Sequence, residues 1–200
     1  ASPLHFQAAQ LLTVGFFETE LSDSLKQLID RGVSGVVLFA RNVESPEQVA
    51  KLIPDIQSYA GRPLFVGLDQ EGGLVQRLRT GFTRVPTMRA VGSLQSEEIA
   101  FEVGELLGAE LRAIGVDINY APILDVDTNP DNPIIGNRSF SNDPELVGRL
   151  GVALGKGIES SGVASCGKHF PGHGDTAQDS HKELPRLPHS MERLEAIELV

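Results

Sequence analysis

The residues best suited to proton transfer are gathered in one polar segment towards the carboxyl end of the chain. Its ionisable side chains are one lysine, three histidines and two aspartates: Lys168, His169, His173, Asp175, Asp179 and His181. Glycines at positions 172 and 174 permit positive φ angles and a close approach of the backbone to a ligand. A segment so rich in polar groups and so poor in core-forming residues is typical of a functional loop.

Asp179 and His181 have the spacing of a general acid/base pair. In an extended chain, residues two apart project to the same side. The Asp179 carboxylate would then accept a hydrogen bond from one imidazole nitrogen of His181, fix its tautomer and leave the other nitrogen for proton transfer. Asp-x-His also occurs by chance, so the alternative is a solvated loop in which the histidines have no chemical role.

A metal site is a second functional alternative for this segment. His169 and His173 are four residues apart, and acidic residues lie nearby. That spacing places two ligands together only on a helix, and Pro171 with the glycines at positions 172 and 174 disfavours a helix. We therefore expect no metal here. Cys166, in an apolar stretch just before the segment, is interpreted as a buried strand residue rather than a nucleophile.

The rest of the chain alternates between strand-like and helix-like segments. Short apolar runs predict strands at residues 11–17, 35–40, 64–68, 116–120 and 163–166. Helical periodicity and capping signals predict helices at residues 22–30, 46–59, 97–113, 144–162 and 191–200. Alternation of this kind indicates a parallel sheet with helical crossovers, hence the α/β class.

Two architectures satisfy this alternation: an open doubly wound sheet and a TIM-type (β/α)8 barrel. Polar residues follow several strands, as at Asp69 and Lys168, and in a barrel those strand ends converge on one mouth. No G-x-G-x-x-G turn follows the first strand, which disfavours a dinucleotide-binding sheet. A complete barrel needs roughly 250 residues. We therefore expect residues 1–200 to be the N-terminal part of one catalytic barrel domain, with roughly its first five βα units.

Composition excludes several classes of protein. The formal net charge of −10 argues against a general nucleic-acid binder, which needs basic patches. No apolar run approaches the roughly 18 residues of a membrane span, and no basic leader opens the chain. With one cysteine there is no intrachain disulfide, so we expect a cytoplasmic location, with a secreted or periplasmic one left open. The oligomeric state is not indicated.

Three motifs together resemble one enzyme family. The run KHFPGHGDT at 168–176 with DSH at 179–181 resembles the signature of bacterial β-N-acetylglucosaminidases of glycoside hydrolase family 3. The run VGLDQEGGLVQR at 66–77 resembles a second signature of that group, and NYAPILDV at 119–126 with GNRSF at 136–140 resembles a third. The motifs occur in the right order and cover the chain from about residue 60 to 185.

The resemblance implies a role for each matching residue. His181 would be the general acid/base, and Asp179 would tune it. A set of charged or imidazole side chains would bind the sugar hydroxyls: Asp69, Arg77, Arg138, Lys168 and His169. Alternatively, Asp69 and Arg77 form a structural ion pair, and Arg138 caps a strand end. The resemblance implies a carbohydrate substrate and no metal or organic cofactor.

The resulting hypothesis is a retaining exo-β-N-acetylglucosaminidase that removes terminal N-acetylglucosamine, with a role in peptidoglycan turnover. Members of this group use an aspartate nucleophile from a later barrel loop, and no matching motif precedes Val200. The nucleophile is therefore expected beyond Val200. Three alternatives stay open: a phosphorylase acting on the same glycosides, a family 3 β-glucosidase and a non-catalytic sugar-binding relative.

Overall fold

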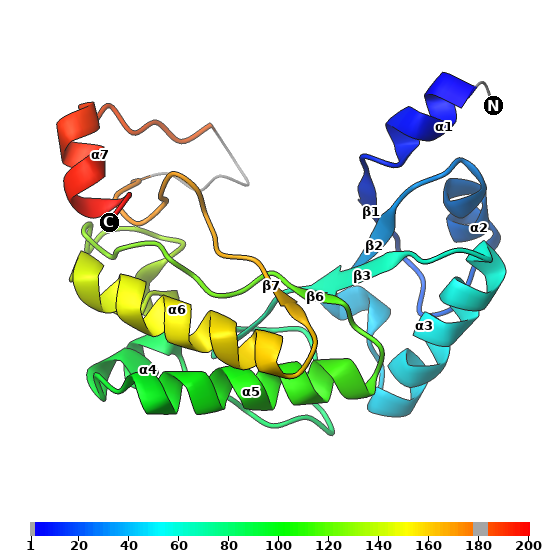
Figure 1. Ribbon diagram of the computed structural model, residues 1–200, viewed down its shortest axis with the longest axis horizontal. Helices are drawn as coiled ribbons and strands as arrows, with labels where there is room; N and C mark the ends of the chain where they lie inside the picture. The colour runs from blue at the N-terminus through cyan, green and yellow to red at the C-terminus, as the bar shows by residue number, and fades with distance from the viewer. Residues whose placement is uncertain (1–2, 178–183) are drawn as a thin grey trace.

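A five-stranded parallel sheet forms the centre of the chain (Figure 1). The computed structural model describes residues 3–177 and 184–200. The strands are β1 (Thr13–Gly15), β2 (Gly35–Leu38), β3 (Phe65–Leu68), β6 (Ile118–Asn119) and β7 (Ala164–Ser165). They pair in parallel in the order β1-β2-β3-β6-β7, the order in which the chain reaches them.

This strand order decides between the two architectures. A doubly wound sheet reverses its strand order at a switch point, whereas a barrel adds each new strand beside the previous one. All five parallel strands follow the second rule. The predicted barrel, represented by about its first five βα units, is therefore confirmed.

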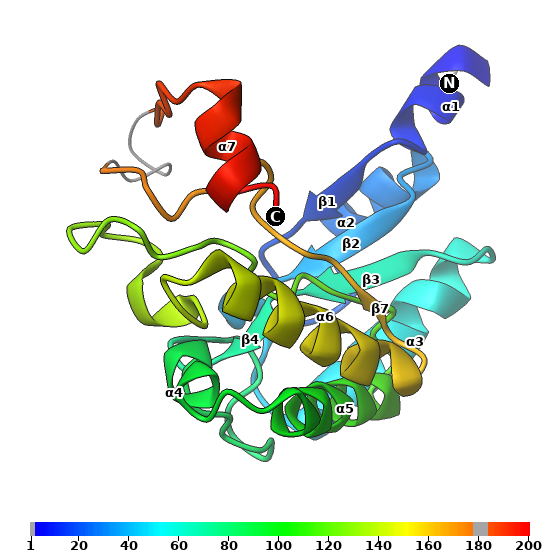
Figure 2. The same ribbon diagram turned by 60° about the vertical axis from the view of Figure 1, so that its left-hand side comes forward.

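Helices connect the strands. They are α1 (Pro3–Ala9), α2 (Asp23–Asp30), α3 (Pro46–Ala60), α4 (Met88–Ser93), α5 (Glu97–Ala113), α6 (Pro144–Ser160) and α7 (Met191–Ile197), with 3-10 turns η1 (Ala40–Asn42) and η2 (Gly136–Arg138). Helices α5 and α6 lie side by side along the sheet (Figures 1 and 2). Gly104 and Gly157 allow this approach, because a Cβ on either would meet a backbone carbonyl of the other helix. Within the described residues, no helix is long and apolar enough to cross a membrane.

The predicted helix at residues 46–59 shows why local signals were sufficient there. The Ser45 hydroxyl accepts a hydrogen bond from the Gln48 backbone N–H (3.1 Å), and Pro46 occupies the first helical position. Such a cap stabilises a helix by about 1 kcal/mol. Gly61 ends the helix at a φ of 60°, which favours glycine. The predicted helix at 97–113 has the same bounds as α5.

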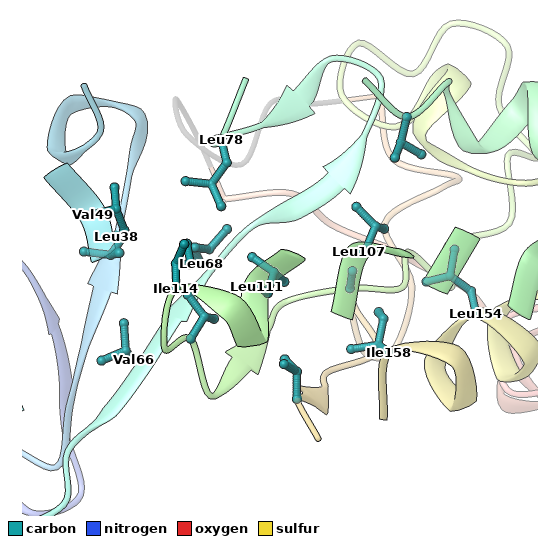
Figure 3. Packing of buried hydrophobic residues seen from close by; sticks show 14 of the residues in the cluster. Leu38, Val49, Val66, Leu68, Leu78, Leu107, Leu111, Ile114, Leu154 and Ile158 are labelled. Carbon is teal, nitrogen blue, oxygen red and sulfur yellow. The ribbon is translucent and has the colours of Figure 1, made fainter. Parts of the chain in front are cut away.

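The hydrophobic core lies between the sheet and these helices (Figure 3). Its buried side chains come from the strands or their flanks and from the inner faces of helices that include α3, α5 and α6. Among them are Leu38, Val49, Val66, Leu68, Leu107, Leu111, Leu154 and Ile158. Burying such a side chain stabilises the fold by about 1.5–3 kcal/mol. The core therefore fixes the strands whose carboxyl ends carry the polar residues.

Two expectations from the sequence need correction. Cys166 is exposed rather than a buried strand residue, and β7 ends at Ser165, one residue before it. The strands are also shorter than the apolar runs predicted, and α1 and α4 were missed. These two helices are short and lack the sustained apolar period on which helix prediction depends.

Candidate active site

Charged side chains that follow two strands converge at the carboxyl edge of the sheet. Asp69 follows β3, and Lys168 lies beyond β7. The Lys168 ammonium donates to Asp69 Oδ1 at 2.6 Å and pairs with Glu71 Oε1 at 2.7 Å. The Lys168 backbone is held by a parallel bridge to Ile123, beyond β6. One lysine thus joins two carboxylates that are 99 and 97 residues away in the chain.

Asp69 is the more accessible of these two carboxylates. Arg77 donates to its Oδ2 at 3.1 Å, and its side chain is 18% exposed. Burial favours a raised pKa for the Asp69 carboxyl, but the hydrogen bonds and charges of Lys168 and Arg77 outweigh it, so the pKa lies below its ordinary value of 3.8. Asp69 is therefore ionised at neutral pH and suited to accept hydrogen bonds from sugar hydroxyls.

Glu71 is almost fully buried and binds Arg138 with both oxygens. The two N–H···O distances are each 2.9 Å, and the Glu71 side chain is 2% exposed. Glu71 was missed by the sequence reasoning, although it lies in the second matched motif. Its position two residues after Asp69, in the same polar run at the end of a strand, was the available signal. The expected Asp69–Arg77 ion pair is therefore part of the expected site. Both belong to one network, in which Glu71 links Arg138 to Lys168.

A short hairpin positions this network. Strand β4 (Gln70–Gly72) pairs antiparallel with β5 (Val75–Gln76) directly after β3. The buried Gln70 amide accepts from the backbone N–H groups of Arg77 and Leu78 and donates to the Leu78 carbonyl. Asn119, at the end of β6, holds the Gln70 backbone from the other side. Every polar group of the Gln70 side chain is used, so the turn between Asp69 and Arg77 has a fixed shape.

His169 is oriented by a buried aspartate. Its Nδ1 lies 2.6 Å from Asp125 Oδ2, and the Asp125 side chain is 0% exposed. The other oxygen of Asp125 accepts from the backbone N–H groups of His169 (3.3 Å) and His173 (2.6 Å). Because the carboxylate accepts, Nδ1 of His169 carries the proton and Nε2 is available to a ligand. Asp125 lies in the third matched motif but was assigned no role from the sequence.

The turn after His169 is closely packed. The His173 Nδ1 lies 2.5 Å from the Thr176 hydroxyl, and the rings of His169 and His173 meet edge to face at 5.8 Å. A Cβ on Gly174 would collide with the Val126 carbonyl, so this position requires glycine. Within the described residues, no group of three or more His, Cys, Asp or Glu side chains has a metal-binding arrangement.

A second hydrogen-bonded group joins two points of the polar segment. Asp175 accepts from the Thr128 hydroxyl and pairs with His189 Nε2, each at 2.7 Å. The Thr128 hydrogen bond lowers the pKa of the Asp175 carboxyl most, burial opposes it, and His189 and the charge of Arg193 add to the lowering. Asp179 and His181, the expected acid/base pair, lie outside the described residues.

The structure thus brings together four of the five expected sugar-binding residues through Glu71, namely Asp69, Arg77, Arg138 and Lys168. His169 follows Lys168 directly and is held separately by Asp125. The arrangement is a partly exposed carboxylate beside fixed cations and an oriented imidazole. Such a set can bind several hydroxyl groups of one sugar in a defined orientation.

Known proteins with similar sequences are hexosaminidases. A β-hexosaminidase of Thiobacillus denitrificans is 47% identical over 174 residues, which cover 84% of this chain and 48% of that protein. One from Neisseria meningitidis serogroup C is 44% identical over 187 residues, covering 90% and 52%. The chain therefore spans about half the length of the curated relatives it matches.

Solved structures give the same result. A family 3 β-N-acetylglucosaminidase from Paenibacillus sp. FPU-7 superposes with a TM-score of 0.96 at 46% identity, covering 100% of this chain and 39% of that one. NagZ from Neisseria gonorrhoeae, in complex with N-trifluoroacetyl-D-glucosamine, gives 0.86 at 38% identity, covering 94% and 57%. Residues 4–200 match the glycosyl hydrolase family 3 N terminal domain. The chain therefore belongs to glycoside hydrolase family 3.

Proposed function

We propose that the protein containing this chain is a retaining exo-β-N-acetylglucosaminidase. The observation that carries the proposal is the strand-end network, in which an ionised Asp69 lies between Lys168 and Arg77. A neutral sugar offers hydroxyl groups, and charge-assisted hydrogen bonds to a fixed carboxylate and fixed cations are the strong, directional way to bind them. The hexosaminidase names of relatives more than 40% identical support the same substrate class.

In this proposal, cleavage proceeds by double displacement. His181 donates a proton to the leaving oxygen and then deprotonates the incoming water, while Asp179 sets its tautomer. The nucleophile is a carboxylate contributed by sequence after Val200. The chain described here supplies the sugar-binding half: Asp69 and the cations hold the hydroxyl groups, and His169 presents Nε2 to the same ligand.

The substrate range follows from the same site. We propose that the terminal N-acetylglucosamine is removed from peptidoglycan fragments. One cysteine and the absence of any disulfide suit an enzyme that acts on such fragments in the cytoplasm. No nucleic-acid partner is proposed, because the net charge is −10.

The test replaces His181 with alanine in the full-length protein. Hydrolysis of a substrate with a poor leaving group, such as N,N′-diacetylchitobiose, should fall by about 100-fold or more, because general acid catalysis contributes on that order. An activated aryl N-acetylglucosaminide, whose leaving group needs little protonation, should be affected much less at the glycosylation step. Equal loss on both substrates would contradict the acid/base role.

Product analysis separates the proposal from its near rival. Reactions run with and without inorganic phosphate should both release free N-acetylglucosamine. Formation of the sugar 1-phosphate would show a phosphorylase instead. Binding without turnover of any glycoside by the full-length protein would indicate a sugar-binding relative.

A further inference from the structure

One feature at the same edge of the sheet has no part in the sugar-binding network. The Arg41 guanidinium, in η1 just after β2, contacts two phenylalanine rings. Its Cζ is 4.8 Å from the ring centroid of Phe17 and 4.6 Å from that of Phe39. Phe17 follows β1 and is 80% exposed, and Arg41 is itself exposed. We call these three residues the Arg41 platform.

Hydrogen bonds to the backbone hold the platform in place. Arg41 Nε donates to the Phe16 carbonyl at 2.7 Å. The fully buried Asn42 side chain donates to the Phe16 and Glu18 carbonyls and accepts from the Phe39 backbone N–H. Gly15 leaves room, because a Cβ there would lie 3.1 Å from the Phe39 ring and 3.3 Å from Arg41 Nη2. The backbone on both sides of Arg41 is therefore pre-organised.

The platform adjoins the sugar-binding network through one shared ring. The Arg77 guanidinium lies 6.0 Å from the Phe39 ring centroid, and Arg77 pairs with Asp69. A ligand held by Asp69 thus has the Arg41 platform beside it. Its exposed aromatic surface is suited to pack against a second sugar ring.

Arg41 lacks an acidic partner in the part of the chain that the structure describes, residues 3–177 and 184–200. The nearby Glu18 carboxylate is engaged by the Ser24 hydroxyl and the Phe17 backbone N–H. In a chain with a net charge of −10, an exposed cation without a carboxylate partner is unusual. Within the described residues only the Nε–H of Arg41 donates a hydrogen bond, to the Phe16 carbonyl, so the two Nη groups are left to match a carboxylate in two-point geometry.

We infer that the Arg41 platform is a subsite that binds a carboxylate on the sugar next to the terminal N-acetylglucosamine. The inference rests on the proposed function and names the substrate feature that it selects. A muramic-type sugar carries such a group on its lactyl ether, whereas a chitin-type sugar does not. Arg41 would therefore distinguish peptidoglycan fragments from chitin fragments.

The test compares two matched ligands on the full-length protein. They are the sulfur-linked analogue of N-acetylglucosaminyl-β-1,4-N-acetylmuramic acid with its carboxylate free, and the methyl ester of the same compound. Sulfur linkage prevents cleavage, so calorimetry gives equilibrium affinities. Wild-type protein should bind the acid about tenfold more tightly than the ester, and added salt should reduce this preference. Equal affinity for acid and ester would overturn the inference without any substitution.

Variants assign the preference to Arg41. Arg41→Gln should weaken binding of the acid about tenfold and leave the ester unchanged. Arg41→Lys, which keeps the charge but loses the planar geometry, should give an intermediate result. Equal weakening of acid and ester by Arg41→Gln would show a purely structural role.

Arg62→Gln is the matched control. Arg62 also donates to backbone carbonyls and lies over a phenylalanine ring, Phe6, but it precedes β3 and so lies at the opposite end of the parallel strands. The Arg62→Gln substitution removes the same charge and should change the affinity for neither the acid nor the ester. If the wild-type protein hydrolyses none of the oxygen-linked substrates, the proposed function is wrong. The affinities for the acid and the ester would still show whether the Arg41 platform binds a carboxylate.

Discussion

Asp69 and Glu71 are two residues apart, and both pair with Lys168, yet their surroundings differ. Asp69 keeps a partly exposed oxygen pair between Lys168 and Arg77. Glu71 is 2% exposed and engaged by Arg138 through both oxygens. In a strand, residues two apart would share one face. Here Gln70 and the hairpin that follows β3 turn one carboxylate to the site edge and the other into the protein.

This difference implies a division of labour. A buried carboxylate that satisfies two cations holds its partners in place, and removing it leaves buried charges without compensation. A partly exposed carboxylate held by two cations is preformed for a ligand, because its orientation needs no reorganisation when a hydroxyl group arrives. Lys168 couples the two functions, since it contacts both groups.

The largest effect is expected from Glu71→Gln. The substitution keeps the volume but leaves the Arg138 and Lys168 charges poorly compensated in a buried setting. Breaking a buried pair in this way costs about 3–5 kcal/mol of unfolding free energy. Chemical denaturation of the full-length protein measures it. A loss below about 1 kcal/mol, the range of exposed pairs, would contradict the structural role given to Glu71.

Asp69→Asn should produce the opposite pattern, with a smaller effect on stability than on catalysis. A hydrogen bond to a charged group contributes about 1.5–3 kcal/mol, so kcat/KM for a simple N-acetylglucosaminide should fall by about 10- to 100-fold. Steady-state kinetics and denaturation of the same sample give both quantities. If Asp69→Asn destabilises the protein as much as Glu71→Gln does, the proposed division of labour is wrong.

The sequence predicted the elements better than the roles of these carboxylates. Helices α3 and α5 were predicted well because caps such as Ser45 and a helical apolar period act within a few residues. The role of Glu71 depends on Arg138, 67 residues away, and that of Asp125 on His169, 44 residues away. Such pairings depend on which strand ends become neighbours, and local patterns do not contain that information.

The motif resemblance partly supplied what local patterns could not. It selected Asp69, Arg77, Arg138 and Lys168 as one group, and the structure brings them together. It gave Glu71 no role, because a motif match does not show which carboxylate is buried against Arg138. The prediction that Cys166 is a buried strand residue was wrong for a related reason: an apolar run predicts a strand but not the residue at which it ends.

The smallest effect is expected at Asp175, a carboxylate of the polar segment beyond β7, which extends the comparison to a more exposed pair. Its pKa is lowered mainly by the Thr128 hydrogen bond. A carboxyl with a lowered folded-state pKa adds stability above the ordinary value of 3.8, and this contribution disappears as the pH falls through the folded-state pKa. Wild type should exceed Asp175→Asn in unfolding free energy by about 1 kcal/mol or less at pH 6.

The pH dependence of that difference identifies its cause. Subtracting the variant's unfolding curve from that of the wild type removes the titration of the other carboxylates, so the remaining difference should shrink towards zero as the pH falls below 3.8. Thr128→Val, which removes the hydroxyl donor and keeps the shape, should reduce the same difference. A difference that is constant down to low pH would mean that Asp175 stabilises this segment through packing and not through its charge. Electrostatic stabilisation would then be limited to the carboxylates that Lys168 contacts, Asp69 and Glu71.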